Sequence, residues 1–162
     1  QSQSHLRNIS SRCWVGAGES IAIAGMQLPT NRRLLIRAIG PSLAQFGVNG
    51  VLTDPKLEIV RPAITTVLRG GPVTLSAQLL TANDDWHAQT IDRVPTEVSW
   101  VGSADEIRGA TGRAGAFPLA EGTKDAAMLV VVGYSPLTVQ VSGVSGSTGV
   151  ALVEVYDVEG SH

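Results

Sequence analysis

The residues of this sequence that are suited to metal binding stand in one short run. Asn83, Asp84 and Asp85 offer clustered oxygen ligands, and Asp54 or Asp157 can join them in a folded chain. A calcium ion takes six to eight oxygen ligands, whereas this run lacks the Asp-x-Asp-x-Asp-Gly spacing. The alternative is a turn whose side chains bond backbone N–H groups, with the following tryptophan packed beneath it. We keep calcium as the one candidate cofactor and otherwise expect none.

Side chains suited to nucleophilic catalysis are scattered. His5, His87 and His162 lie far apart in the sequence, and no Gly-x-Ser-x-Gly motif occurs. Cys13 lies in an expected strand, where a small buried thiol is its usual role. The glycine-rich segment 109–115 follows an expected helix, whereas a phosphate-binding loop precedes one. It also lacks Gly-Lys-Ser/Thr, so we do not expect it to bind phosphate. We therefore expect a protein that is not an enzyme.

Tryptophan side chains are the candidates for binding a sugar, because an aromatic face can stack on a pyranose ring. Trp86 and Trp100 are the two proposed stacking residues, with Trp14 as a third tryptophan. The chain has only seven aromatic residues in all (2 Phe, 3 Trp, 2 Tyr), so filling the core competes with ligand binding for their use. Both roles stay open.

Composition limits the class of protein. The 162 residues are enough for one domain. Charged residues make up 16% and the net charge is −2. The protein therefore has no strong positive potential that would attract nucleic acid. No apolar stretch reaches the roughly 18 residues of a membrane span. The single cysteine excludes an intrachain disulfide.

The hydrophobic pattern predicts an all-β domain, an antiparallel β-sandwich of jelly-roll or Ig-like type. Two short helical turns are expected, one over 41–46 that Gly47 ends, and one over 103–108. The second has a capping box, Ser103 with Glu106, and Gly109 as its stop. Strands are expected over 21–24, 33–39, 57–60, 65–68, 73–79, 98–101, 127–132, 137–142 and 150–156.

Period-2 alternation selects the side chains that should point into the core. The expected inward residues are Ile21, Ile23, Leu35, Leu57, Ile59, Leu129, Val131, Val139, Val141, Leu152 and Val155. The run 128–132 is apolar at every position, which predicts that both faces of that strand are covered.

A series of motifs resembles a known type of module. The series comprises Asn-Ile-Ser-Ser-Arg at 8–12, Leu-Ile-Arg-Ala-Ile-Gly-Pro-Ser-Leu at 35–43, Phe-Gly-Val at 46–48, Asn-Asp-Asp-Trp at 83–86, and Thr-Gly-Val-Ala-Leu-Val-Glu-Val-Tyr-Asp at 148–157. Together they resemble a β-sandwich module found singly or in tandem in secreted and surface proteins of environmental bacteria. The resemblance implies an exported, non-catalytic module. Segments of about 61–80 and 87–101 look like insertions relative to it.

The N-terminal segment predicts location and assembly. Gln-Ser-Gln-Ser at positions 1–4 is typical of a mature chain after signal-peptide removal, which predicts a protein outside the cell or on its surface. The alternative is that the sequence is a fragment. We expect residues 1–10 to form an extended arm and 11–162 to form the single domain. Leu6 and Ile9 of this arm are the candidate residues for adding a strand to the sheet of the next subunit.

A long uncharged segment motivates that hypothesis. Residues 126–153 are 28 consecutive positions without a charge, and natural sheets protect their exposed edges with charges or proline. Either other strands of the chain cover this segment, or a neighbouring subunit does. The first function we consider is therefore an extracellular structural protein that self-assembles into a filament or surface layer through strand complementation. The alternative is a carbohydrate- or cell-surface-binding module of a larger secreted protein.

Overall fold

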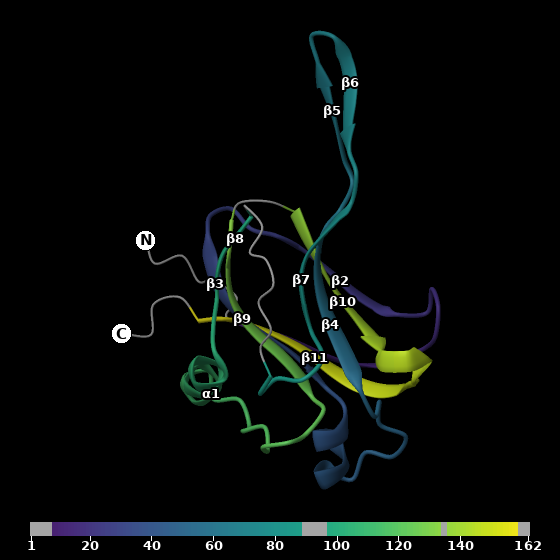
Figure 1. The fold of residues 1–162 in the computed structure, drawn as a ribbon, viewed down its shortest axis with the longest axis vertical. Helices are drawn as coiled ribbons and strands as arrows, with labels where there is room; N and C mark the ends of the chain where they lie inside the picture. The colour runs from purple at the N-terminus through teal and green to yellow at the C-terminus, as the bar shows by residue number, and fades with distance from the viewer. Residues whose placement is uncertain (1–7, 89–96, 134–135, 159–162) are drawn as a thin grey trace.

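A computed structural model describes residues 8–88, 97–133 and 136–158 of the chain. Within them two antiparallel sheets pack face to face, which confirms the all-β sandwich expected from the sequence (Figure 1). None of the helices in these residues is long and apolar enough to cross a membrane.

The first sheet has five strands in the order β1-β11-β3-β9-β8. Its strands are β1 (Asn8–Val15), β3 (Arg32–Ile39), β8 (Val98–Val101), β9 (Ala126–Val132) and β11 (Gly149–Asp157). The second sheet has the order β2-β10-β4-β7. Its strands are β2 (Ala22–Gln27), β4 (Pro55–Arg61), β7 (Gln78–Asn83) and β10 (Pro136–Gly143).

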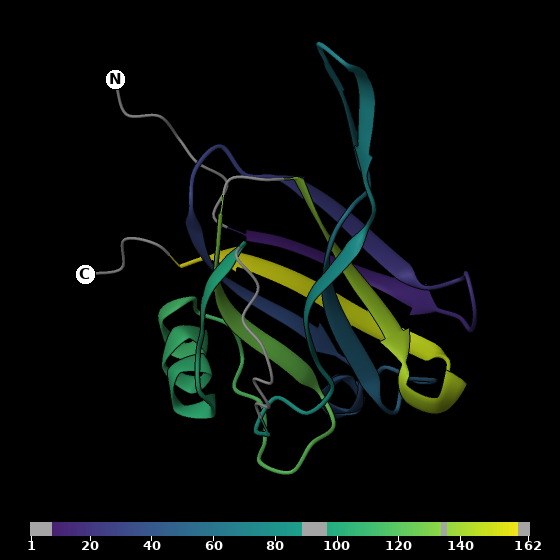
Figure 2. The same cartoon turned by 45° about the horizontal axis from the view of Figure 1, so that its top comes forward.

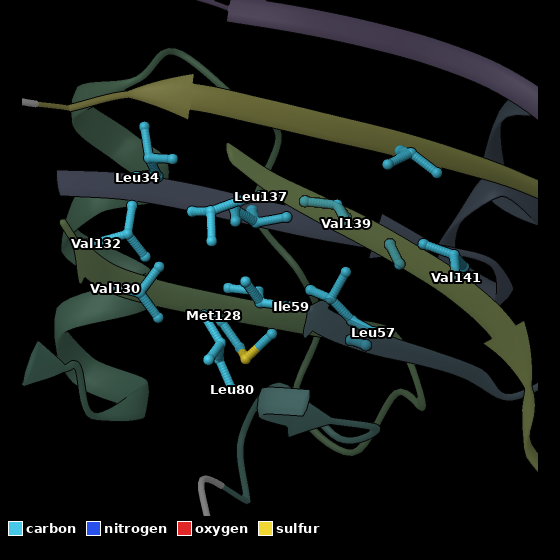
Figure 3. Close-up of a cluster of buried hydrophobic side chains, with 14 of the residues drawn as sticks. Leu34, Leu57, Ile59, Leu80, Met128, Val130, Val132, Leu137, Val139 and Val141 are labelled. Atoms are coloured by element: carbon cyan, nitrogen blue, oxygen red, sulfur yellow. The ribbon is translucent and has the colours of Figure 1, made fainter. Parts of the chain in front are cut away.

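The main core lies between the two sheets. Leu57 and Ile59 of β4 and Val139 of β10 are fully buried against side chains of the other sheet (Figure 3). Burying each such side chain contributes about 1.5–3 kcal/mol, so this layer supplies most of the apolar stabilisation. These three residues, with Val141, confirm the inward positions expected for β4 and β10.

Strand β9 is covered on both faces, as its uninterrupted apolar run predicted. Met128 and Val130 point into the main core. Ala127 and Leu129 point the other way, into a second apolar cluster beneath the helix α1 (Ala104–Arg113). Leu35 of β3 also lies in this second cluster, so it is buried as expected but outside the sandwich.

Five of the predicted inward residues are not fully buried. The prediction that Ile23 points inward was wrong, because its side chain is 60% exposed. Ala22, Ala24 and Met26 of β2 face the core in its place. The run alternates as a strand should, but its inward phase is that of these three residues and not that of Ile23. The other four are only partly buried: Ile21, Val131, Leu152 and Val155.

The uncharged segment 126–153 is covered within the chain. Strand β9 lies between β3 and β8, β10 lies between β2 and β4, and β11 lies between β1 and β3. All three strands are therefore interior strands of their sheets. Their lack of charge follows from burial and does not itself require a neighbouring subunit.

Two short helices, η1 (Pro41–Phe46) and α1, flank the sheets, and a single 3-10 turn, η2 (Val144–Gly146), joins β10 to β11. The 3-10 helix η1 ends at Gly47, whose φ of 76° is left-handed, as predicted. The capping box of Ser103 and Glu106 is present at the start of α1. Gly109 does not end α1, however, because the helix continues to Arg113 with Ile107, Ala110 and Thr111 buried on one face. Tertiary packing of that face outweighs the low helix propensity of glycine.

The segment 61–80 forms a ribbon that leaves the body of the molecule. Within the described residues, strands β5 (Ile64–Leu68) and β6 (Gly71–Leu75) pair only with each other. They extend the β4–β7 pair beyond the end of the second sheet, and both views show the hairpin projecting from the sandwich (Figures 1 and 2). The predicted strand 73–79 is thus two strands, β6 and β7, which Ser76 and Ala77 separate.

The N-terminal strand starts earlier than the boundary expected for the arm. β1 begins at Asn8 and pairs with β11 of the same chain, with Ile9 opposite Val155. Residues 8–10, expected in the arm, are therefore part of the first sheet.

Candidate functional site

The exposed large apolar side chains gather in two places on the molecule. Val67, Leu68, Val73 and Leu75 lie on the β5–β6 hairpin, and Leu79 follows at its base. A second group lies on β1 and β2, the edge strands of the two sheets on one side of the sandwich. It consists of Ile9 and Trp14 on β1 and Ile23 on β2. Among the described residues, Phe46 of η1 is the remaining one. Clustered exposed apolar groups mark interaction sites.

The register of the hairpin gives it an apolar face. Ile64 is opposite Leu75, Thr66 is opposite Val73, and Leu68 is opposite Gly71. Residues that are opposite in an antiparallel pair share a face, and every second residue along each strand shares it too. We call Ile64, Leu68, Val73 and Leu75 the hairpin apolar face.

The other face of the hairpin is more polar. Thr65 and Thr74 form a cross-strand pair, with their hydroxyl oxygens 2.8 Å apart in a hydrogen bond. Val67 and Pro72 are the next pair on that side. A two-stranded hairpin that packs on nothing is only marginally stable in water, so its apolar face is suited to a partner.

The base of the hairpin is tied to the body by polar contacts. The Arg61 guanidinium donates a hydrogen bond of 3.0 Å to the side-chain oxygen of Gln78, across β4 and β7. Arg61 also lies 3.4 Å from a carboxylate oxygen of Glu97. These contacts fix the direction in which the hairpin leaves the sheet.

The second apolar group lines two hollows between the edge strands β1 and β2. One hollow of about 330 Å³ lies beside Ile9, Met26 and Leu28. The other, also of about 330 Å³, lies beside Cys13, Trp14 and Ile23. We call these two hollows together the edge groove. Burial raises the pKa of the Cys13 thiol, which keeps it protonated at neutral pH and agrees with a structural role.

Charged residues near these surfaces are few. Arg32 and Asp157 line the Ile9 end of the edge groove and pair with each other at 3.5 Å, and Arg12 lies on β1. Arg69, in the turn of the hairpin, is the single charged residue between Ile64 and Leu75. Glu19 is the single charged residue of the loop that joins β1 to β2, beside the Trp14 end of the edge groove. In the part of the chain that the structure describes, neither residue has an ionic partner.

Polar residues of the motifs at 35–43 and 148–157 form a buried network and do not line an open site. Arg37 of β3 is opposite Glu154 of β11, with its Nε 3.1 Å from Glu154 Oε2. Arg37 donates a hydrogen bond to the Phe117 carbonyl oxygen, and its guanidinium lies 4.5 Å from the centre of the Phe117 ring. The Tyr156 hydroxyl donates to Glu154 Oε1 at 2.8 Å.

Burial dominates the electrostatics of this network. It lowers the pKa of Arg37, against the opposing effect of Glu154 and of the other neighbouring anionic groups. Burial also raises the pKa of Tyr156 to about 12, with the hydrogen bond to Glu154 adding to the shift. The charges are paired and enclosed, so this network fixes the β3–β11 register and the loop at Phe117.

A second buried carboxylate holds the start of η1. Asp125 Oδ1 accepts hydrogen bonds from the backbone N–H groups of Gly40 and Ser42. The Ser42 hydroxyl donates to Asp125 Oδ2 at 2.5 Å. Asp125 is fully buried, and these three donors account for its presence there.

Asn83, one of the three residues proposed for calcium binding, makes hydrogen bonds that stabilise the fold. The Asn83 amide oxygen accepts a hydrogen bond from the Ala127 N–H, and its amide nitrogen donates to the Asp85 carbonyl oxygen. Lys124 lies close to the run: its ammonium bonds Asp54, which raises the Lys124 pKa, and the charges of Asp85 and Asp84 add to this. Among residues 8–88, 97–133 and 136–158, no group of three His, Cys, Asp or Glu side chains is arranged to hold a metal ion.

The tryptophans differ in accessibility. Trp86 is 1% exposed and its indole N–H donates to the Ala120 carbonyl oxygen, so the protein covers the ring. It is therefore unsuited to stacking on a sugar. The side chain of Trp100 lies outside the described residues. Trp14 is 64% exposed, so its indole is accessible to a ligand.

The remaining candidate residues do not come together. His87 is exposed next to Trp86, while His5 and His162 lie outside the described residues. Of the two residues proposed for assembly, Leu6 also lies outside them. Ile9 is 56% exposed but belongs to a strand that is already paired in its own chain.

Comparisons with protein-family models, with curated proteins and with solved structures find no match to this chain. The likeness of its motifs to a bacterial surface module therefore stays a prediction. The sequence reasoning missed the hairpin apolar face as a site. The signal was present, since the inserted segment has threonine and larger apolar residues on both sides of a glycine turn.

Proposed function

We propose that this chain is a non-catalytic structural subunit that assembles with copies of itself outside the cell. The observation that supports assembly most is the hairpin apolar face, where Leu68, Val73 and Leu75 are each between 43% and 57% exposed on a ribbon that projects from the sandwich. Exposing such side chains to water is unfavourable by about 25 cal/mol per Å² of apolar surface. Covering them in an assembly recovers that free energy.

The low charge of the chain favours the same proposal. With 16% charged residues and a net charge of −2, copies of the chain repel one another weakly. The extracellular location rests on the likeness of the motifs to exported surface modules. The arm residues Leu6 and Ile9 were the first candidates for the contact, but the pairing of β1 with β11 leaves the hairpin as the better one.

The mass of the protein in solution tests this proposal, measured by light scattering over a range of micromolar concentrations. We expect the wild-type mass to rise with concentration. The double variant Leu68→Lys/Leu75→Lys places two charges on the hairpin apolar face and should remain a monomer. Val67→Lys is the matched control, because Val67 is 79% exposed on the opposite face of the same hairpin, and it should assemble as the wild type does. A wild-type chain that stays monomeric throughout contradicts the proposal.

Glycan binding is the second candidate function, and the exposure of Trp14 beside the edge groove favours it. An exposed indole at a hollow is suited to stacking on a pyranose ring. Retention on insoluble polysaccharides, compared between wild type, Trp14→Ala and Trp100→Ala, tests this role. Loss of retention in Trp14→Ala supports it, and no retention of the wild type on any polysaccharide rules it out for the sugars used.

A further inference from the structure

We propose that the edge groove between β1 and β2 receives the β5–β6 hairpin of a second copy of this chain. The inference rests on the proposed self-assembly and names the surface that the hairpin contacts. It follows from the distribution of the exposed apolar residues, which form one projecting group and one hollowed group.

The two surfaces agree in length. Each hairpin strand has five residues, which span about 17 Å at about 3.4 Å per residue. The edge groove follows β1 from Ile9 to Trp14, a comparable length of strand. An extended ribbon can therefore lie along the groove with its apolar face toward Met26 and Cys13.

The strands that border the groove have free edges. β1 pairs with β11 on one side, and β2 pairs with β10 on one side, so each is the last strand of its sheet in the part of the chain that the structure describes. The unpaired backbone groups of an edge strand can accept an added strand. A hairpin in the groove can thus combine apolar burial with backbone hydrogen bonds to β1 or β2.

Charge complementarity favours this occupant and gives it a direction. The hairpin has one charge, Arg69 at its tip, and the loop at the Trp14 end of the groove has one charge, Glu19. Neither has an ionic partner among the described residues of its own chain. With the hairpin tip directed to the Trp14 end, the two unpaired charges of opposite sign approach each other.

The contact differs in symmetry from a pairing of two hairpins. The donor uses its hairpin and keeps a free groove, whereas the receiver uses its groove and keeps a free hairpin. Such a heterologous contact does not close on itself in a dimer, and it extends into a ring or a filament.

A mixing experiment tests the inference. The hairpin variant Leu68→Lys/Leu75→Lys keeps a working groove, and the groove variant Ile9→Lys/Ile23→Lys keeps a working hairpin. Both groove positions are more than half exposed, so the charges do not enter the core. We expect each variant alone to be a monomer and an equimolar mixture to form a heterodimer that grows no further. Phe46→Lys, at a position 58% exposed on η1, is the control and should assemble as the wild type does.

The outcomes separate this inference from the proposed function. If the wild type assembles but the groove variant still assembles alone, the hairpins pair with each other or with another surface, and only this inference fails. The same holds if the wild type assembles and the mixture gives no heterodimer. If the wild type is a monomer at all concentrations, the proposed function fails as well.

A charge exchange tests the direction of the hairpin. Arg69→Glu and Glu19→Arg should each weaken assembly by about two- to fivefold, the effect of one exposed ion pair. The chain with both substitutions should recover most of the wild-type affinity. Equal weakening in the single and double variants excludes the pairing of these two residues.

Discussion

Arg37 and Glu154 are directly opposite each other on β3 and β11, 117 residues apart in the chain, and both are buried from solvent. Breaking a buried ion pair leaves one charge without compensation. We therefore expect Glu154→Gln to lower the free energy of unfolding by about 3–5 kcal/mol, as measured by urea denaturation. Glu121→Gln is the control, because the Glu121 side chain is 68% exposed in its ion pair with Arg108, and it should change stability by less than about 0.5 kcal/mol. A Glu154→Gln protein as stable as this control contradicts the structural role of the pair.

Tyr156 should make the fold sensitive to alkali. Its pKa is raised to about 12 in the folded chain, from an unfolded value of 10.0. A raised pKa means that the folded state holds the proton more tightly, so this stabilisation is present below pH 10 and is lost as the pH rises toward 12. The loss should reach about 2–3 kcal/mol. Tyr156→Phe should remove this component, and an unchanged pH dependence in that variant disproves the assignment.

Gly40 is required by a close approach of backbone rather than by its dihedral angles. A Cβ atom at this position would overlap the Leu52 carbonyl oxygen. We expect Gly40→Ala to destabilise the chain by about 1–3 kcal/mol through this overlap. Gly25→Ala is the control, because a Cβ atom there meets no atom within 4 Å. Thermal unfolding of the two variants compares them, and equal melting temperatures would rule out the overlap.

Cys13 can report on the edge groove, because it lines one of the two hollows. Burial raises its pKa, so less thiolate is present at neutral pH and alkylation by iodoacetamide should be slower than for a free thiol. In the wild type the rate should fall further as concentration increases and a hairpin covers the groove. In Leu68→Lys/Leu75→Lys the rate should not depend on concentration. A wild-type rate that is also independent of concentration contradicts coverage of the groove.

Local patterns in the sequence predicted local features of the fold. The capping box at Ser103 placed the start of α1, and Gly47 placed the end of η1. The apolar run at 128–132 indicated a strand with two covered faces, because no alternation left a polar side. These signals depend on a few neighbouring residues, so they can be detected in the amino-acid sequence without knowledge of the fold.

Features that depend on long-range contacts were not predictable in the same way. The side of β2 that faces the core depends on its pairing with β10, and the inward phase predicted for Ile23 was wrong. The end of α1 depends on the burial of Ile107 and Ala110. The network of Arg37, Glu154 and Tyr156 depends on strand order, which the sequence did not determine.

In the candidate site too, local features were predictable from the sequence and features that depend on long-range contacts were not. The sequence located an insertion at about 61–80 with two expected strands in it. It did not indicate that this segment projects from the body, since that depends on where the second sheet ends. Trp86 was considered both for the core and for sugar stacking, and its burial places it in the core. The edge groove joins two strands whose side-by-side position only the fold reveals.

Hydrogen–deuterium exchange of the hairpin amides, measured at low and at high micromolar concentration, tests the central claim most directly. In the free chain the β5–β6 hairpin projects from the sandwich, so its amides should exchange fast. If copies of the chain cover the hairpin, peptides spanning Ile64–Leu75 should become protected as concentration rises, while peptides from α1 stay unchanged. Hairpin exchange that is fast and equal at both concentrations contradicts assembly through this hairpin.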